Sequence, residues 1–240
     1  MDRPNLDAQL DRAASLGDPV RRALYRFVVA SSDPISRDEA AAGVGVERHV
    51  AKFHLDRLAR DGLLTFDYQR PAGRGGPGAG RPTKRYHQAD AQLDVSLPER
   101  RYQLAGELLV EAVAAAEHDG LPITEAVHDV AVEAGRAAGS QARQTLGRRP
   151  RAVDMVSATV QLLADQGYEP CPEGGDVVLA NCPFHALAHR DAELVCGMNL
   201  AFVEGVVDGL GAASFRARLD PSETRCCVRL ERSRTGRMAV

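Results

Sequence analysis

Tryptophan is absent from this 240-residue chain, and aromatic residues together make up only 5% of it. Ala, Val and Leu must therefore build most of the core, which favours helices with small buried faces. No stretch approaches the roughly 20 apolar residues that a membrane span needs. The first ten residues are charged and lack the hydrophobic core of a signal peptide, so we expect a cytoplasmic protein with no membrane partner.

Acidic residues are scarce in one part of the chain. Residues 20–89 hold 13 Lys and Arg against 7 Asp and Glu, whereas the remainder holds 17 against 26, which the net charge of −3 conceals. A basic segment joined to an acidic body indicates a polyanion-binding domain attached to a second domain. The length is sufficient for two domains.

The basic segment has the pattern of three helices followed by a hairpin. Ser36 and Glu39 form a capping box at the start of the second helix, and Gly43-Val44-Gly45 is a tight turn before the third. The segment between the two strands is rich in Gly and Pro, so it cannot be a helix. Helices are expected over 19–31, 37–42 and about 47–60, and strands over 63–68 and 83–87. This order predicts a winged helix-turn-helix.

The third helix is the one expected to enter the major groove of DNA. The face opposite Leu55 and Leu58 carries the candidate contacts Arg48, His49, Lys52 and Phe53. Residues nearer the helix N-terminus reach deepest into the groove, so Arg48 and Lys52 are the preferred base contacts. Phe53 either touches a thymine methyl or packs against the wing.

The wing segment, residues 68–89, has five basic residues and no acidic one. Such residues can neutralise phosphates or enter a minor groove. For any single arginine, a solvated loop residue is an equally good interpretation. The candidate wing contacts are Arg70, Arg74, Arg81, Lys84 and Arg85.

Residues 19–89 resemble the ArsR-like winged-helix repressors. The run Ala51-Lys52-Phe53-His54-Leu55-Asp56-Arg57-Leu58 and the following Asp61-Gly62-Leu63-Leu64 match the recognition helix and its exit. The resemblance implies a double-stranded DNA operator as partner. Because half-sites one helical turn apart require two DNA-binding units, we expect a homodimer. An Ala- and Leu-rich helix over 96–117 is the candidate interface, unless it packs within one subunit.

The fold class expected for the whole chain is mainly α with small β elements (α+β). It comprises a winged helix-turn-helix domain over 1–90, a helical linker and dimerisation region over 91–148, and a C-terminal α/β sensor domain over 149–240. In the last region we expect strands over 176–181, 215–219 and 226–230, a short helix at His185, and a helix from near Cys196 to Leu210.

Cysteines cluster in the last third of the chain, and in a reducing cytosol such clusters indicate a metal or redox centre more often than a disulfide. Thirteen residues separate Cys182 from Cys196, and 29 separate Cys196 from Cys226. This is neither a zinc-finger nor a ferredoxin spacing, so separate elements would have to supply the ligands. His185 and Cys171 are candidates for a fourth position. The alternative is that the thiols are buried small apolar groups.

Cys226 and Cys227 are neighbours on the expected last strand, so their side chains would point to opposite faces. One of them then belongs to the core. We take Cys226 as the ligand and keep Cys227 as the alternative. Cys171, in a Pro-Cys-Pro loop, is interpreted as incidental.

Nearly the full length of the chain resembles the iron–sulfur-responsive repressors of the suf cluster-assembly operon, in their actinobacterial form. The motifs that carry the resemblance are Asn181-Cys182-Pro183-Phe184-His185, Val195-Cys196-Gly197 and Arg225-Cys226-Cys227. The resemblance implies a [4Fe–4S] or [2Fe–2S] cluster held by Cys182, Cys196 and Cys226. It also implies repression of assembly genes when the cluster is bound.

Two other functions are compatible with the sequence. A winged-helix regulator could use the same thiols to bind Zn²⁺ or to respond to oxidation without a cluster. An enzyme could use Cys182 as nucleophile with His185 as base, but no orienting Asp or Asn and no oxyanion motif accompanies them, so we expect no enzymatic activity. Glu107, Glu111 and His118 fit a solvated helix face better than a metal site.

Overall fold

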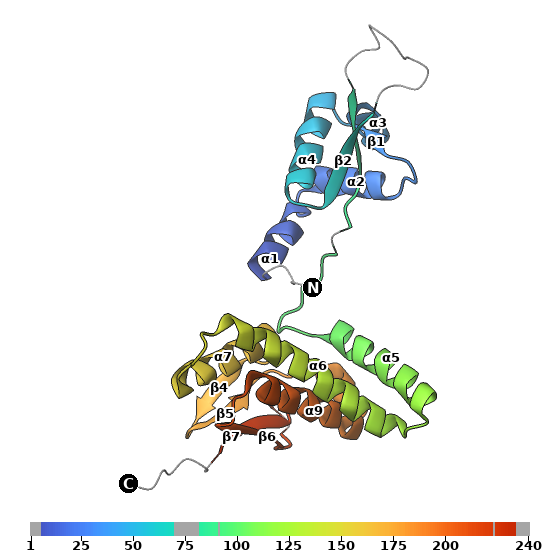
Figure 1. Ribbon diagram of the computed structural model, residues 1–240. Helices are drawn as coiled ribbons and strands as arrows, with labels where there is room; N and C mark the ends of the chain where they lie inside the picture. The colour runs from blue at the N-terminus through green and yellow to red at the C-terminus, as the bar shows by residue number, and fades with distance from the viewer. Residues whose placement is uncertain (1–5, 70–81, 91, 223, 234–240) are drawn as a thin grey trace. The chain divides into compact units, whose positions relative to one another are not determined.

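A computed structural model describes residues 6–69, 82–90, 92–222 and 224–233. The chain divides into two compact units, Met1–Val95 and Ser96–Val240. Helices predominate, and the strands form two small antiparallel sheets (Figure 1). The predicted α+β class is confirmed. No helix among the described residues is long and apolar enough to cross a membrane.

The first unit is a helical bundle with a three-stranded antiparallel sheet of order β1-β3-β2. Its buried core is formed mainly by aliphatic side chains of α2 and α4, closed by Tyr86 from the sheet. Its elements are α1 (Leu6–Ser15), α2 (Pro19–Val29), β1 (Ile35–Ser36), α3 (Arg37–Val44), α4 (Arg48–Arg60), β2 (Leu64–Gln69) and β3 (Thr83–Gln88).

The turn between α3 and α4 begins two residues later than predicted, because α3 continues to Val44. The capping box of Ser36 and Glu39 is present, as expected. Gly43, however, lies within α3, where a Cβ atom would meet the Phe27 ring at 2.2 Å, so close packing requires this glycine. Gly45 alone makes the turn, with φ at 74°, a left-handed conformation that favours glycine.

In the second unit, α9 packs between the sheet and α6 (Figure 1). The sheet is antiparallel with order β4-β5-β7-β6. Residues expected as a separate helical region, 91–148, contribute α5 and α6 to the same hydrophobic core as the sheet. The elements are α5 (Tyr102–Asp119), α6 (Ile123–Thr145), α7 (Ala152–Asp165), β4 (Pro170–Glu173), β5 (Asp176–Leu179), α8 (His185–Ala188), α9 (Ala192–Leu210), β6 (Phe215–Leu219) and β7 (Val228–Arg232).

Glycines bring the backbones of α6 and α9 into direct contact. A Cβ atom on Gly135 would lie 2.0 Å from the Phe202 carbonyl oxygen, and one on Gly205 would lie 2.1 Å from that of Val132. Gly139 and Gly209 meet the opposite backbone at 2.4 and 2.1 Å in the same way. Larger residues at these positions would force the two helices apart.

Three expected elements have different boundaries. α5 begins at Tyr102 and not at Ser96, because Pro98 lacks an N–H and disfavours helix in the residue before it. Cys226 and Cys227 precede β7, so strand alternation does not decide which face each one takes. The Pro-Cys-Pro segment expected as a loop forms β4, an edge strand that tolerates proline.

Candidate functional site

A cavity of about 480 Å³ in the second unit brings together three of the predicted cysteine ligands. Cys182 reaches it from the loop after β5, Cys196 from the second turn of α9, and Cys227 from the segment before β7. His185 and His189 also line it. Segments separated by up to 45 residues therefore converge on one space.

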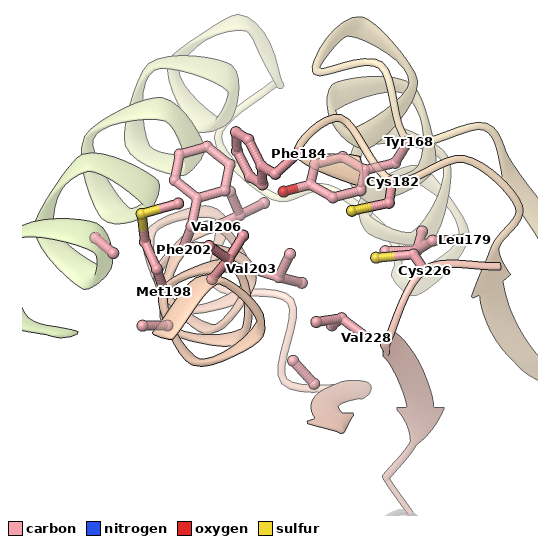
Figure 2. Packing of buried hydrophobic residues seen from close by; sticks show 14 of the residues in the cluster. Tyr168, Leu179, Cys182, Phe184, Met198, Phe202, Val203, Val206, Cys226 and Val228 are labelled. Carbon is pink, nitrogen blue, oxygen red and sulfur yellow. The ribbon is translucent and has the colours of Figure 1, made fainter. Parts of the chain in front are cut away.

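Cys226 lies beside this cavity but faces the protein interior. Its side chain is 2% exposed, and its backbone N–H donates to the Leu179 carbonyl at 3.0 Å. Figure 2 shows Cys226 and Cys182 at the edge of the buried cluster, near Tyr168. Cys227 is partly exposed and lines the cavity. The geometry therefore favours Cys227, the alternative ligand, as the one that faces the cavity.

A buried hydrogen-bond chain supports the cysteine pair. The Tyr168 hydroxyl donates to Asn199 Oδ1 at 2.6 Å, and Asn199 Nδ2 donates to Cys226 Sγ at 3.1 Å. Asn199 Nδ2 also lies 4.0 Å from Cys227 Sγ. Sequence reasoning missed both residues. The only available signal was the position of Asn199, three residues and about one helical turn after Cys196.

The thiols influence one another's ionisation. Hydrogen bonding with Cys226 lowers the pKa of Cys227 to about 6, and hydrogen bonds from Cys196 and Asn199 act in the same direction. Hydrogen bonding with Cys226 also lowers the pKa of Cys182, against the opposing effect of burial. Burial, then hydrogen bonding with Cys227, raises the pKa of Cys196 to about 12. The pKa values of Cys227 and Cys182 are therefore lowered, whereas that of Cys196 is raised.

The remaining pKa shifts at this site have related causes. Hydrogen bonding to Cys182 and Cys227, together with burial, raises the pKa of Cys226. Burial raises the pKa of Tyr168 well above its usual range. Tyr168 therefore stays protonated. Its hydroxyl donates to Asn199 Oδ1, and the amide N–H of Asn199 faces the Cys226 sulfur.

The cavity wall is cationic. Among the described residues that line it, none is Asp or Glu, whereas Arg100 and Arg225 are present. The His185 and His189 rings are in contact, with 3.2 Å between their Nε2 atoms. His189 is a third residue that the sequence did not reveal, although its spacing of four residues from His185 is a helical one.

The donor set of the cavity consists of soft ligands. Among the described residues, no group of three or more His, Cys, Asp or Glu side chains is placed to hold one ion. Three thiols and two imidazoles nevertheless line one space, and thiolates are the ligands of structural zinc sites and of iron–sulfur clusters. The residues present therefore have the chemistry that either group requires.

Other candidate ligands lie outside the cavity. Cys171 is exposed on β4, with its thiol 3.7 Å from the Glu169 carbonyl oxygen. On α5, Glu107 accepts a hydrogen bond from Gln103, and the His118 side chain is 88% exposed. Glu107 and His118 therefore belong to a solvated face of α5.

In the first unit, α4 exposes the predicted DNA-contact residues on one face. Arg48, His49, Lys52 and Phe53 are all exposed there, and Phe53 is 66% exposed, so it does not pack against the described part of the wing. Arg48 forms an ion pair with Asp38 of α3 at 2.5 Å. Because both partners are more than half exposed, this pair can open at little cost.

The predicted wing contacts divide into two groups. Lys84 binds Asp56 at 2.5 Å and lies 3.6 Å from the centre of the Phe66 ring, and Arg85 binds Glu39 at 2.9 Å. Both therefore attach the sheet to the helices within the unit. Arg70, Arg74 and Arg81 lie outside the described residues.

Comparison with known families identifies the first unit. A sequence model of the helix-turn-helix domain matches residues 16–65, from the end of α1 to the start of β2. Searches of the curated proteins and of the solved structures returned no match. The match supports a DNA-binding transcriptional regulator, and the predicted helix-turn-helix is confirmed.

Proposed function

We propose that this protein is a transcriptional repressor whose operator affinity is controlled by an iron–sulfur cluster bound in the second unit. The observation that carries the proposal is the convergence of Cys182, Cys196 and Cys227 on one cavity without a carboxylate. Thiolates are the preferred ligands of iron–sulfur clusters, whereas hard cations require oxygen ligands.

The charge of the cavity supports the same assignment. Three thiolates bring negative charge into a partly buried site, and burial of charge is costly unless it is compensated. Arg100 supplies positive charge at the wall, and Asn199 donates an N–H to the sulfur of Cys226. The charge of Arg225 is already paired with Asp220, at 2.7 Å. A bound cluster would supply sensitivity to oxidants and to iron supply.

Cys226 has a supporting role in this proposal. Its buried thiol accepts a hydrogen bond from Asn199, and its backbone N–H donates to the Leu179 carbonyl. Cys226 thereby fixes the segment that carries Cys227 without facing the cavity itself. His185 or His189 is available for a fourth position, because both line the same wall.

DNA recognition is assigned to α4. Arg48, His49, Lys52 and Phe53 would contact the bases and backbone of the major groove, with Lys52 free of the ion pair that Arg48 makes.

We further propose a homodimer through α5. One face of this helix is buried in its own unit, whereas Val110 and Val113 on the other are 71% and 48% exposed. Val110→Asp is expected to yield a monomer in light scattering, and Glu107→Ala on the same helix is expected to remain dimeric. A Val110→Asp protein that stays dimeric would exclude this interface.

The decisive experiment is anaerobic purification with iron and sulfide analysis. Wild type is expected to be brown, with visible absorption, and Cys182→Ser, Cys196→Ser and Cys227→Ser are expected to lose it. Cys171→Ser is the matched control, because its thiol lies outside the cavity, and should retain full iron content.

The outcomes separate the alternatives. A colourless wild type containing stoichiometric zinc would establish the zinc-binding regulator in place of the cluster protein. A colourless, metal-free wild type whose DNA binding changes on peroxide treatment would establish direct thiol oxidation. Equal iron in all four variants would show that the ligand set is wrong.

A further inference from the structure

The segment that begins the second unit is attached to the loop that carries Cys182. Arg100 Nη1 donates to Asn181 Oδ1 and, at 3.0 Å, to the Cys182 carbonyl oxygen. Asn181 Nδ2 returns a hydrogen bond to the Glu99 carbonyl at 2.8 Å. The two stretches are about 80 residues apart in the sequence, so this contact is a product of the tertiary fold.

Two more hydrogen bonds extend the attachment on either side. The Arg101 N–H donates to the Pro183 carbonyl at 3.0 Å, and the Ala186 N–H donates to the Tyr102 hydroxyl at 3.3 Å. Five hydrogen bonds therefore join residues 99–102 to residues 181–186. A displacement of the cysteine loop must move the segment with it or break these bonds.

Asn181 has no freedom to compensate for such a displacement. Its side chain is 6% exposed, and its amide also donates to the Gly167 carbonyl at 2.6 Å. A buried amide that loses its partners bears the full desolvation cost of its polar groups. The attachment therefore has a defined closed state, and opening it exposes or orphans several groups together.

The same segment is the covalent connection to the DNA-binding unit. Asp94 donates its backbone N–H to Gln9 Oε1 of α1 at 3.1 Å, within the first unit. Residues 95–98 alone separate that anchor from Glu99, the first residue held by Asn181. A change at residues 99–102 therefore acts on the stretch of chain that leads directly into the first unit.

The cavity contacts this segment directly. Pro98 and Arg100 line it together with Cys182, so whatever occupies the cavity lies against both partners of the attachment. An occupant can shift a two-state element only if it interacts differently with the two states. Arg100 meets this requirement, because its guanidinium can either hold Asn181 and Cys182 or face negative charge in the cavity.

We propose that Arg100 and Asn181 form a latch that couples occupancy of the cysteine cavity to the segment entering the DNA-binding unit, and hence to operator affinity. The identity of the occupant rests on the function proposed above. The latch itself rests on hydrogen bonds between described residues.

The test compares wild type with Arg100→Ala and Asn181→Ala. Arg151→Ala is the matched control, because Arg151 is an exposed arginine of the same unit that pairs only locally with Asp154. Each protein is prepared empty and after anaerobic reconstitution with iron and sulfide. Binding is measured to one DNA duplex selected from a random pool with wild type, and hydrogen exchange is measured over residues 96–102.

For wild type, and equally for Arg151→Ala, the DNA affinities of the empty and the loaded protein are expected to differ at least fivefold. In Arg100→Ala and Asn181→Ala the DNA affinity of the empty protein and that of the iron-containing fraction, with iron measured for each preparation, should agree within twofold. Exchange over residues 96–102 should become faster in both latch variants, even when empty.

Variants that keep the wild-type affinity ratio, or unchanged exchange over residues 96–102, would overturn the latch. A wild type that takes up no iron would contradict the proposed function instead. In that case, exchange in the empty latch variants decides whether the attachment exists as described.

Discussion

Asn199 Nδ2 lies 3.1 Å from Cys226 Sγ, and the Tyr168 hydroxyl fixes the orientation of that amide from the other side. All three side chains are at most 2% exposed. Sulfur accepts hydrogen bonds more strongly as a thiolate than as a thiol, so this N–H donor contributes to the lowered pKa of Cys227. The chain thus contains a permanent donor aimed at its cysteines.

The first prediction follows for Asn199→Leu. Hydrogen bonding with Cys226 is the largest cause of the lowered pKa of Cys227, and Asn199 adds to it, so loss of the amide should raise that pKa from about 6 by part of the way to 9.0. In the empty protein, the pH at which iodoacetamide labels Cys227 at half its maximal rate should increase accordingly. The unpaired Tyr168 hydroxyl should lower the free energy of unfolding by about 1–3 kcal/mol.

Thr159→Val provides the control for this variant. Thr159 is also fully buried, but its hydroxyl donates to Met155 within its own helix. It should lose stability without a change in the labelling profile. An unaltered profile in Asn199→Leu would show that the amide has only a packing role.

The second prediction concerns the contact of α6 with α9. Gly135→Ala places a Cβ atom 2.0 Å from the Phe202 carbonyl oxygen, and should lower the free energy of unfolding by about 3 kcal/mol. Gly106→Ala on α5 meets nothing within 4 Å and should raise it by about 0.5–1 kcal/mol. Urea unfolding followed by circular dichroism measures both. If both substitutions changed the free energy of unfolding in the same direction, the close contact of α6 with α9 would be contradicted.

The sequence predicted the first unit well because its signals are local. The Ser36 capping box, the apolar spacing on α4 and the positions of the two wing strands all depend on neighbouring residues. α1 was missed, because its buried residues are the polar Gln9 and Ser15, whereas Leu6 and Leu10 are exposed. Gly43 was misassigned, because the need for glycine there comes from Phe27, 16 residues earlier.

The cysteine site was less predictable for a physical reason. The spacing of Cys182, Cys196 and Cys226 shows only that distant elements would have to converge, and residue type identifies thiols but not their direction. The choice between Cys226 and Cys227 depends on the segment ahead of β7, where no strand alternation applies. Asn199 and Arg100 belong to the site through tertiary hydrogen bonds alone.

The third prediction distinguishes a lysine that contacts DNA from a lysine that stabilises the fold. Lys52→Ala should weaken operator binding about tenfold and reduce the dependence of affinity on salt, because Lys52 is exposed on α4. Lys84→Ala should mainly lower the stability of the first unit, because Lys84 binds Asp56 and the Phe66 ring. Fluorescence anisotropy over a salt series, at a temperature where both variants are folded, separates the two. A normal salt slope in Lys52→Ala would exclude it as a phosphate contact.

The last prediction uses the pH dependence of the Asp56 contacts. Burial alone would raise the pKa of Asp56, but hydrogen bonds from Lys84 and Tyr86 outweigh it and lower the pKa below 3.8. The folded-state pKa is thus depressed, so this carboxylate stabilises the first unit fully above its unfolded pKa and loses that effect as pH falls through the lower folded value.

Asp56→Asn should therefore destabilise the first unit at pH 7, where the wild-type carboxylate is ionised, and much less at the acidic end of the range. Hydrogen exchange over α4 and β3, measured from pH 7 down to the lowest pH at which wild type stays folded, reports the local stability. Glu39→Gln is a comparison within the same unit, because Glu39 has a lowered pKa through Ser36 and Arg85 and should show the same sign. A difference between wild type and Asp56→Asn that stays constant with pH would mean that the Asp56 carboxylate contributes through shape and not through charge.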